Sequence, residues 1–321
     1  MPLRVAVLCG GRSGEHEISL RSAESIVAGL DRTKYAVQRI FISPEGRWEP
    51  GPISPEPGAN PGIDVVFPVL HGTFGKDGTV QGLLELADLP YVGAGVLASA
   101  VSMDKEITKR LLAERGLPVV EYVTVTRARR NNFNLPFPLF VKPANLGSSV
   151  GISKVKNCAE LETALQLAGQ YDRKILVERG IEGRELECSV LGSEQPVAAI
   201  PCEIIPSREF YDYEDKYLLD AAKLLVPAPL TPEQTAEIQK LAVDAYQAVD
   251  CEGMARVDFL LEASTGKLYI NEINTIPGFT SISMYPKMWE QAGVPFAELL
   301  DRLIDLALER HRTRQATRFT R

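Results

Sequence analysis

The first hundred residues alternate short apolar runs with segments of helical spacing, and this alternation is the feature that most limits what the chain can fold into. The runs LRVAVLCGG, YAVQRIFIS and DVVFPVL have the length of buried strands, and YVGA predicts a further short strand. Between them, SLRSAESIVAGL and GTVQGLLELADL have helical spacing, with Ser19 as the predicted N-cap of the first helix. Because strands and helices follow one another in turn, the sequence predicts a parallel sheet with helices on its faces.

Two longer stretches complete this first part of the chain. Residues 43–62 are rich in Pro and Gly, and we interpret them as a surface loop because the strand–helix alternation resumes after them. Residues 96–116 are amphipathic throughout and predict one long helix that leaves the first part of the chain.

The pattern changes near Val119, where short strands become closely spaced. VVEYVTV, PLFVKPA, VGISKV and KILVERG are separated by turns and by one predicted helix, CAELETALQLAG. This arrangement predicts a small antiparallel sheet with helices, which is a different layer type and therefore a second domain.

A third region is again rich in strands. ELECSVLG, PVAAIPCEII, ARVDFLLE and KLYINEIN are predicted strands, interrupted by a helix that has Thr231 as N-cap and Pro232 at its first position. The predicted final helix PFAELLDRLIDLALERH is followed by a basic tail, residues 312–321, which we expect to be a frayed, solvated end. The sequence thus predicts domains at residues 1–103, 104–185 and 186–321.

Composition excludes several classes of protein. A formal net charge of −7 argues against a general nucleic-acid binder. Five cysteines are scattered without CxxC spacing, which is typical of free thiols in a cytosolic protein. The apolar start is too short for a secretory signal, and no run has the length of a transmembrane helix. We therefore expect a cytoplasmic protein that binds neither nucleic acid nor membrane.

The last predicted hairpin concentrates oxygen ligands at one place. Strand pairing can bring Asp258 beside Glu272, and Asn274 shares a face with Glu272, although the register cannot be read to one residue. Neighbouring carboxylates repel unless a cation lies between them, and hard oxygens suit Mg²⁺ or Mn²⁺. Taken alone, this pattern is equally consistent with a solvated strand end that carries incidental charges.

Two loops have the composition of ligand-binding segments. The turn Gly147–Gly151 follows Lys142 and exposes backbone N–H groups and hydroxyls that suit phosphate oxygens, although a plain hairpin has the same pattern. The segment of about 206–226 mixes aromatic and charged side chains, which is typical of a lid that closes over charged ligands and also of a protein contact loop.

The first strand–helix turn, GGRSGEHEIS, carries two carboxylates. Glu17 is placed to favour a helix N-terminus, whereas Glu15 lies in the glycine-rich turn itself and is better placed to meet a cationic ligand. His71 ends a strand at the edge where open α/β sheets place their sites, although a structural histidine is the commoner case.

The order of these motifs closely resembles that of the D-alanine–D-alanine ligases, which are ATP-grasp carboxylate–amine ligases. The motifs are GGRSGEHEISLRSAE, LHGTFGKDGTVQG, SMDK, VKPANLGSSVGIS, FYDYEDKY, ARVDF and NEINTIPGFTSISMYP. The resemblance covers nearly the whole chain apart from the proline-rich loop and the basic tail. It implies a mixed α/β fold, α+β in its ATP-binding part, with three domains and ATP between two antiparallel sheets.

The resemblance also implies roles in binding ATP and metal. Residues implied to contact ATP are Lys105, Lys142, Ser149, Glu178, Arg179, Ile181, Glu185 and Lys216. Within that set, the backbone at Glu178 is implied to meet adenine, Glu185 the ribose, and the lysines the phosphates. Ligands implied for two Mg²⁺ or Mn²⁺ ions are Asp258, Glu272 and Asn274.

For the amino-acid substrates, the resemblance implies that Glu15 holds the ammonium of the first D-alanine. Ser148 and Tyr217 match its hydrogen-bonding partners, which link the glycine-rich turn to the lid. The residues implied to face the reacting carboxylate are Arg256 and Gly278, those implied to bind the second D-alanine are Ser283 and Met284, and His71 matches a residue that lines the site.

The implied reaction is ATP-dependent ligation of two D-alanines through a D-alanyl phosphate, by a protein that the family suggests is a homodimer. A D-alanine–D-lactate or D-serine ligase of the same family is the first alternative, although Tyr217 and the complete YDYEDKY favour the dipeptide. The GFTSISMYP segment argues against ligases of the glutathione type, and intact Arg256, Asp258, Glu272 and Asn274 argue against a regulator without catalysis.

Overall fold

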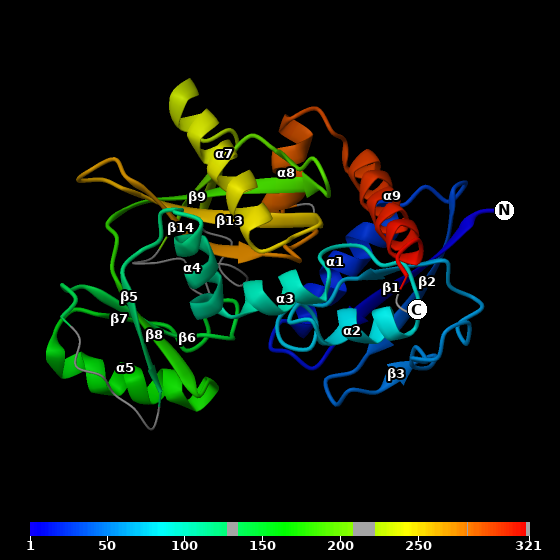
Figure 1. The fold of residues 1–321 in the computed structure, drawn as a ribbon, viewed down its shortest axis with the longest axis horizontal. Helices are drawn as coiled ribbons and strands as arrows, with labels where there is room; N and C mark the ends of the chain where they lie inside the picture. The colour runs from blue at the N-terminus through cyan, green and yellow to red at the C-terminus, as the bar shows by residue number, and fades with distance from the viewer. Residues whose placement is uncertain (127–133, 208–221, 281, 319–321) are drawn as a thin grey trace.

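The computed structural model describes residues 1–126, 134–207, 222–280 and 282–318. The strands of this described part form three separate sheets, and helices pack against them (Figure 1). The first sheet has the order β3-β2-β1-β4; its strands are β1 (Leu3–Gly10), β2 (Tyr35–Ile42), β3 (Trp48–Glu49) and β4 (Val65–Pro68). β1 pairs in parallel with both β2 and β4, and the short β3 pairs antiparallel with β2. The predicted parallel sheet is therefore confirmed, with one small antiparallel strand from the proline-rich loop at its edge.

Both faces of the first sheet are covered because side chains alternate along β1. Val5 and Val7 pack with α1 (His16–Gly29) and with α9 (Phe296–Gln315), whereas Ala6 and Leu8 pack with α2 (Thr79–Leu86). The C-terminal helix α9 thus shares a core with the N-terminal sheet, and Figure 1 shows it beside that sheet.

The second sheet is antiparallel and has the order β5-β8-β6-β7. Its strands are β5 (Tyr122–Thr126), β6 (Leu139–Pro143), β7 (Ser153–Val155) and β8 (Lys174–Arg179). Helix α5 (Cys158–Tyr171) covers one face, where Ala164, Leu165 and Ala168 pack on the strands.

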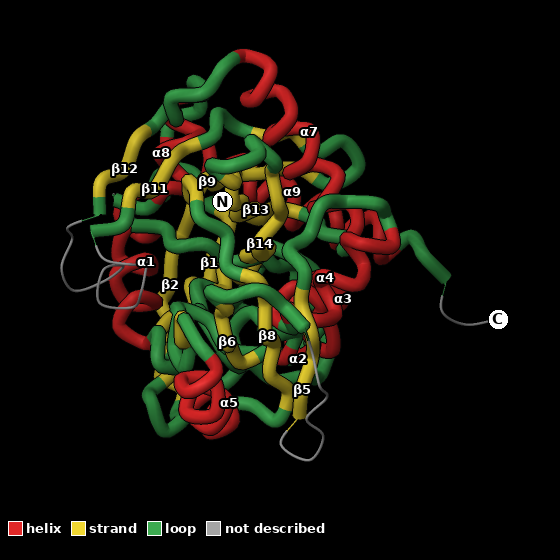
Figure 2. Tube along the Cα trace, turned by 90° about the vertical axis from the view of Figure 1, so that its left-hand side faces the viewer, coloured by secondary structure: helices red, strands yellow, loops and turns green. Residues whose placement is uncertain are grey.

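The third sheet is also antiparallel, with the order β12-β11-β9-β13-β14 and β10 paired to β9. Its strands are β9 (Gly183–Gly192), β10 (Val197–Ala198), β11 (Cys202–Ile205), β12 (Lys223–Leu225), β13 (Gly253–Glu262) and β14 (Leu268–Asn274). Helix α7 (Pro232–Ala248) covers one face and α8 (Met284–Gln291) the other. The view turned by 90° places α7 and α5 at opposite ends of the molecule (Figure 2).

The predicted long helix over residues 96–116 is wrong: the segment forms two helices, α3 (Val96–Met103) and α4 (Lys105–Glu114). Asp104 between them is extended, and its carboxylate accepts a hydrogen bond from Ile107 N at 3.1 Å. Its side chain therefore caps the N-terminus of α4, and α3 ends at Met103. This break directs α4 toward the second and third sheets and places Lys105 at its first turn.

Other boundaries differ from the predictions for identifiable reasons. Helix α1 begins at His16, so Ser19 is not its N-cap; the Ser19 hydroxyl is buried, accepts from Gly10 N and donates to Val69 O. The predicted YVGA strand is reduced to a single parallel bridge between Tyr91 and Val66. The basic tail is helical as far as Gln315.

The tail is held by contacts with the first part of the chain. Arg314 pairs with Glu85, and Arg310, just before the tail, donates to the carbonyls of Tyr91 and Gly93. In contrast, the predicted Thr231 cap is confirmed as a full capping box with Gln234, preceding Pro232. The division into domains at residues 103 and 185 stays a prediction. Within the described residues, no helix is both long and apolar enough to span a membrane.

The two N-caps allow a test of these local assignments. Thr231→Ala should lower the free energy of unfolding by about 1 kcal/mol because it removes the capping hydrogen bond. Asp104→Ala should cost more, since Asp104 also accepts a hydrogen bond from Lys174 Nζ at 2.7 Å. Urea denaturation of both variants measures the difference, and an Asp104→Ala variant as stable as the wild-type protein would contradict the break at α4.

Candidate active site

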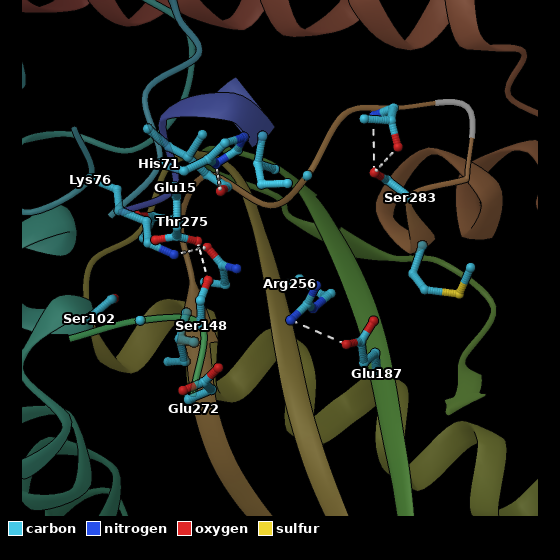
Figure 3. Close-up of a pocket in the computed structure, with 18 of the residues that line it drawn as sticks. Glu15, His71, Lys76, Ser102, Ser148, Glu187, Arg256, Glu272, Thr275 and Ser283 are labelled. Carbon is cyan, nitrogen blue, oxygen red and sulfur yellow. Dashed lines mark hydrogen bonds and ion pairs between the residues drawn. The ribbon is translucent and has the colours of Figure 1, made fainter. Parts of the chain in front are cut away.

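A cavity of about 750 Å³ lies where elements of all three sheets converge (Figure 3). The residues expected from the sequence that line it are Glu15, His71, Lys105, Ser148, Arg256, Glu272, Asn274, Gly278, Ser283 and Met284. Those that are described but lie off the cavity wall are Lys142, Ser149, Glu178, Arg179, Ile181, Glu185 and Asp258. Lys216, Tyr217 and most of the predicted lid lie outside the described residues.

Glu15 and Ser148 connect the first sheet to the second. Glu15 precedes α1 at its N-cap position and is buried, and its Oε1 accepts a hydrogen bond from the Ser148 hydroxyl. The glycine-rich turn approaches the carboxylate closely: a Cβ added to Gly147 would lie 3.1 Å from Glu15 Oε2. A side chain at this position would therefore crowd the carboxylate, and glycine avoids that contact.

The hairpin of β13 and β14 brings the three candidate metal ligands together. Asp258 lies directly opposite Glu272, and Arg256 lies opposite Asn274, with a bulge immediately after Asp258. Within the described chain, no group of three or more His, Cys, Asp or Glu side chains could hold a metal ion. Asp258, Glu272 and Asn274 instead offer two carboxylates and one amide oxygen, and hard oxygens of this kind fit Mg²⁺ or Mn²⁺.

Each of these oxygen donors faces a cationic side chain of the protein. The Asp258 carboxylate accepts two hydrogen bonds from Arg256, both at 2.6 Å, and Lys105 Nζ lies 3.9 Å from Glu272 Oε2. Lys76 Nζ donates to Asn274 Oδ1 at 3.1 Å. In this structure, each of the three candidate ligands therefore faces positive charge supplied by the protein itself.

Arg256 lies between two carboxylates. Besides Asp258, its guanidinium lies 3.2 Å from Glu187 Oε1, which β9 presents across from Asp258 (Figure 3). Burial would lower the pKa of Arg256, but the two carboxylates outweigh it and raise the pKa above its ordinary value. The guanidinium therefore stays charged and fixed in orientation.

Glu178 lies between two lysines in the second sheet. Lys142 Nζ is 2.5 Å from Glu178 Oε2, and Lys109 Nζ from α4 is 3.2 Å from Oε1. Burial would raise the pKa of Glu178, but the two ammonium groups outweigh it and hold that pKa below its usual value. The expectation for Glu178 concerned its backbone; the structure shows that its buried side chain also orients Lys142.

The remaining residues expected near ATP lie around the end of β8 and the start of β9. Arg179 donates to Glu262 Oε1 at 2.7 Å and to the Tyr269 hydroxyl at 3.0 Å. Its backbone N–H donates to Glu121 O, and Ile181 follows in the loop before β9. Glu185 pairs with Leu260 within the third sheet. The residues expected near ATP therefore extend from the second sheet to the third.

The loop after β14 closes the other side of the cavity. Ser283 Oγ accepts a hydrogen bond from Thr280 N at 2.9 Å, and Met284 begins α8 and is buried. A Cβ added to Gly278 would lie 2.9 Å from Ser283 Oγ, so a side chain at this position would displace the Ser283 side chain.

Sequence reasoning missed Lys76, Ser102, Lys109 and Glu187. Lys76 is in the LHGTFGKDG motif, and its charge beside two glycines was an available signal. Lys109 is four residues after Lys105 and therefore lies on the same face of α4. Two lysines on one helix face are not typical of an apolar core, and this spacing was an available signal. Ser102 and Glu187 carry no such signal, because only the tertiary fold turns them toward the cavity.

Comparisons with known proteins agree over the length of the chain. The family model for the D-ala D-ala ligase C-terminus matches residues 111–305, and the model for the N-terminus matches residues 4–61 and 52–94. The D-alanine--D-alanine ligase of Solibacter usitatus is 71% identical over 325 residues, covering 100% of both chains.

Solved structures are similar as well. The D-alanine-D-alanine ligase from Coxiella burnetii has a TM-score of 0.88 at 42% identity, covering 98% of this chain and 96% of that one. VanG D-Ala:D-Ser ligase from Enterococcus faecalis has a TM-score of 0.87 at 36% identity, covering 96% of this chain and 100% of that one. The D-alanine--D-alanine ligase from Bacillus anthracis complexed with ATP has a TM-score of 0.81 at 28% identity, covering 97% of this chain and 99% of that one.

These matches and the two antiparallel sheets beside the cavity define the fold as that of the ATP-grasp enzymes. The expected mixed α/β architecture is therefore confirmed. The chain belongs to the D-alanine–D-alanine ligase family.

The pairing of Glu178 with Lys109 can be tested by stability. Lys109→Met keeps the length of the side chain but leaves Glu178 with one ammonium partner, and breaking a buried ion pair on one side costs about 3 kcal/mol. We expect urea denaturation to show a loss of that size.

A matched control is Lys240→Met, which removes an exposed pair with Asp244 on α7 and should cost well under about 1 kcal/mol. Equal, small losses in the two variants would show that Glu178 does not depend on Lys109.

Proposed function

We propose that the chain ligates two D-alanines to D-alanyl-D-alanine at the expense of ATP, through a D-alanyl phosphate, for peptidoglycan precursors. One observation carries this proposal: the buried Glu15, hydrogen-bonded to Ser148, shares a cavity with Arg256 and Gly278 in a chain 71% identical to a D-alanine--D-alanine ligase. A buried carboxylate favours an ammonium group, and the carboxylate of the same amino acid then faces Arg256.

ATP lies between the second and third sheets in this proposal. Glu178, Arg179 and Ile181 bind adenine and Glu185 binds ribose. Ser149 of the glycine-rich turn contacts the phosphates, as do Lys105 and Lys142, because ammonium and backbone N–H groups stabilise phosphate charge. Asp258, Glu272 and Asn274 would hold two Mg²⁺ or Mn²⁺ ions, which neutralise phosphate charge when bound.

The first step activates the carboxylate of the first D-alanine. A carboxylate is a poor acyl donor because its leaving group would be oxide, and transfer of the γ-phosphoryl group converts that oxygen into a phosphate leaving group. Glu15 and Ser148 fix the amino end of the substrate meanwhile, so that the carboxylate is held in one orientation.

The second step forms the peptide bond. The amine of the second D-alanine, held by its carboxylate at Ser283 and Met284, attacks the acyl carbon after losing a proton. Arg256 and the N–H of Gly278 stabilise the tetrahedral oxyanion, and phosphate then leaves. Lys216 and Tyr217 belong to the proposed lid, which excludes water from the acyl phosphate.

Three further parts of the proposal follow from the sequence: its pattern gives the domain bounds, its composition the cytoplasmic location, and the family resemblance the homodimer. The domains are residues 1–103, 104–185 and 186–321, the protein is a homodimer, and it acts in the cytoplasm. A D-alanine–D-serine ligase is the second candidate, favoured by the likeness to the VanG structure, and D-lactate is a third acceptor to consider.

Phosphate release with purified protein distinguishes these activities. With ATP and Mg²⁺, we expect release on adding D-alanine alone, with dipeptide as the product, and none with L-alanine or after chelation of the metal. D-alanine mixed with D-serine or D-lactate is the comparison. The proposed substrate would be wrong if D-alanine alone failed while a mixture gave product.

A further inference from the structure

The turn from Ile276 to Phe279 is hydrogen-bonded at both ends to side chains from the first part of the chain. His71 Nδ1, in the loop after β4, lies 3.1 Å from Ile276 O. Ser22 Oγ, on α1, accepts a hydrogen bond from Phe279 N at 3.2 Å. The two side chains also meet each other, with Ser22 Oγ 3.2 Å from His71 Nε2.

The identity of these atoms fixes where the protons lie. A carbonyl oxygen only accepts, so His71 Nδ1 must carry a proton and donate to Ile276 O. Phe279 N–H donates to Ser22 Oγ, which leaves the hydroxyl proton of Ser22 to donate to Nε2. The hydrogen bonds therefore run from Phe279 through Ser22 and His71 to Ile276, and they require the neutral Nδ1–H tautomer of the imidazole.

The surroundings of His71 favour that neutral form. His71 is 4% exposed and Ser22 is fully buried. The pKa of His71 is lowered to about 4, because burial and, to a smaller extent, Lys76 outweigh the opposite effects of Glu15 and of the bond to Ile276. The imidazole is thus neutral near pH 7 and can accept from Ser22.

The chain of hydrogen bonds encloses only two residues, Pro277 and Gly278. Gly278 carries the backbone N–H that the proposed function assigns to the oxyanion, and Pro277 has no N–H of its own. Ile276 O belongs to the peptide unit 276–277 and Phe279 N to the unit 278–279. The unit 277–278, which carries the Gly278 N–H, therefore lies between two fixed peptide units. Donors to an oxyanion act through their fixed position, so a support of this kind bears on the rate of the chemical step.

We propose that Ser22 and His71 are positioning residues that hold the Gly278 N–H at the reacting carboxylate by clamping both ends of the turn 276–279. This inference rests on the proposed function. It assigns His71 a role through the turn, beyond lining the cavity, and it gives Ser22, which lies within the first motif, a role that the resemblance did not assign. Figure 3 shows His71 above Thr275, on the side of the cavity where this turn begins.

Steady-state kinetics of four variants test the proposal. Ser22→Ala removes both bonds of Ser22, and His71→Ala removes both bonds of the imidazole. His71→Asn retains an amide donor near the Nδ1 position and should recover part of the loss. Because removing an oxyanion donor costs about 100-fold or more in kcat, misplacing one should cost about tenfold in Ser22→Ala and His71→Ala. The KM for ATP should stay within about twofold, since the clamp is not assigned to nucleotide binding.

The fourth variant, Ser19→Ala, is the matched control. Ser19 is also fully buried on α1, accepts from Gly10 N and donates to Val69 O, but has no bond to the turn 276–279. We expect a fall in melting temperature like that of Ser22→Ala, with kcat within about twofold of wild type. If Ser22→Ala keeps wild-type kcat, or if Ser19→Ala loses as much kcat as Ser22→Ala, the clamp is only structural and the proposal fails.

Nitrogen NMR gives a second readout that does not depend on activity. The chain has only 3 histidines, so ¹⁵N-histidine labelling can resolve His71 from His16 and His311 with a His71→Asn spectrum as reference. We expect His71 as the Nδ1–H tautomer, unchanged between pH 5.5 and 8.5. An Nε2–H tautomer, or titration within that range, would overturn the proposal.

These outcomes distinguish a failure of the proposed function from a failure of the positioning role. If the wild-type protein forms no dipeptide, the proposed function fails whatever the variants do. If it forms dipeptide while Ser22→Ala behaves like Ser19→Ala, the positioning role fails and the proposed function stands.

Discussion

Buried charges around the cavity are paired with one another, and the arrangement of the three sheets depends on that pairing. Removing one partner of a buried ion pair costs several kcal/mol, so each pair constrains the elements that carry it. Glu178 of the second sheet meets Lys109 of α4, Lys105 faces Glu272 from the third, and the Glu15 carboxylate accepts a hydrogen bond from Ser148. Elements distant in sequence are thereby held at ion-pair or hydrogen-bond distance around one space.

The same pairing prepares the cavity for a polyanionic ligand. Lys142 is oriented by Glu178, and Arg256 by Asp258 and Glu187, before any phosphate or carboxylate arrives. Cations held in this way need little reorganisation when a substrate binds, and this preorganisation is the usual source of electrostatic catalysis. The clamp of Ser22 and His71 extends this principle from charged side chains to a backbone N–H.

Part of this structure could be predicted from the sequence because local patterns determine it. Strand alternation gave the parallel first sheet, and the capping signal at Thr231 placed α7 correctly. The hairpin could place Asp258 near Glu272, but the register needed the structure, since the bulge after Asp258 shifts the pairing. The break at Asp104 was missed because apolar spacing continues across it and only the cap marks it.

Features that depend on tertiary contact could not be predicted in the same way. Helix α8 was missed because its Pro286 suggests a turn, although proline is tolerated in the first turn of a helix. Ser22 looked like any polar residue on α1, and Lys109 like a solvated lysine on α4; both are buried by elements more than sixty residues away. The basic tail was expected to fray because Arg314, like Arg310 just before the tail, finds its partner only when α9 packs on the first sheet.

Transfer of oxygen from substrate to phosphate tests the central claim, ligation through an acyl phosphate, most directly. With D-alanine labelled with ¹⁸O in its carboxylate, the C–O bond that breaks in the second step leaves one labelled oxygen on phosphate. The account predicts one ¹⁸O in each phosphate released during dipeptide formation, measured by mass spectrometry. Unlabelled phosphate formed in step with dipeptide would contradict it.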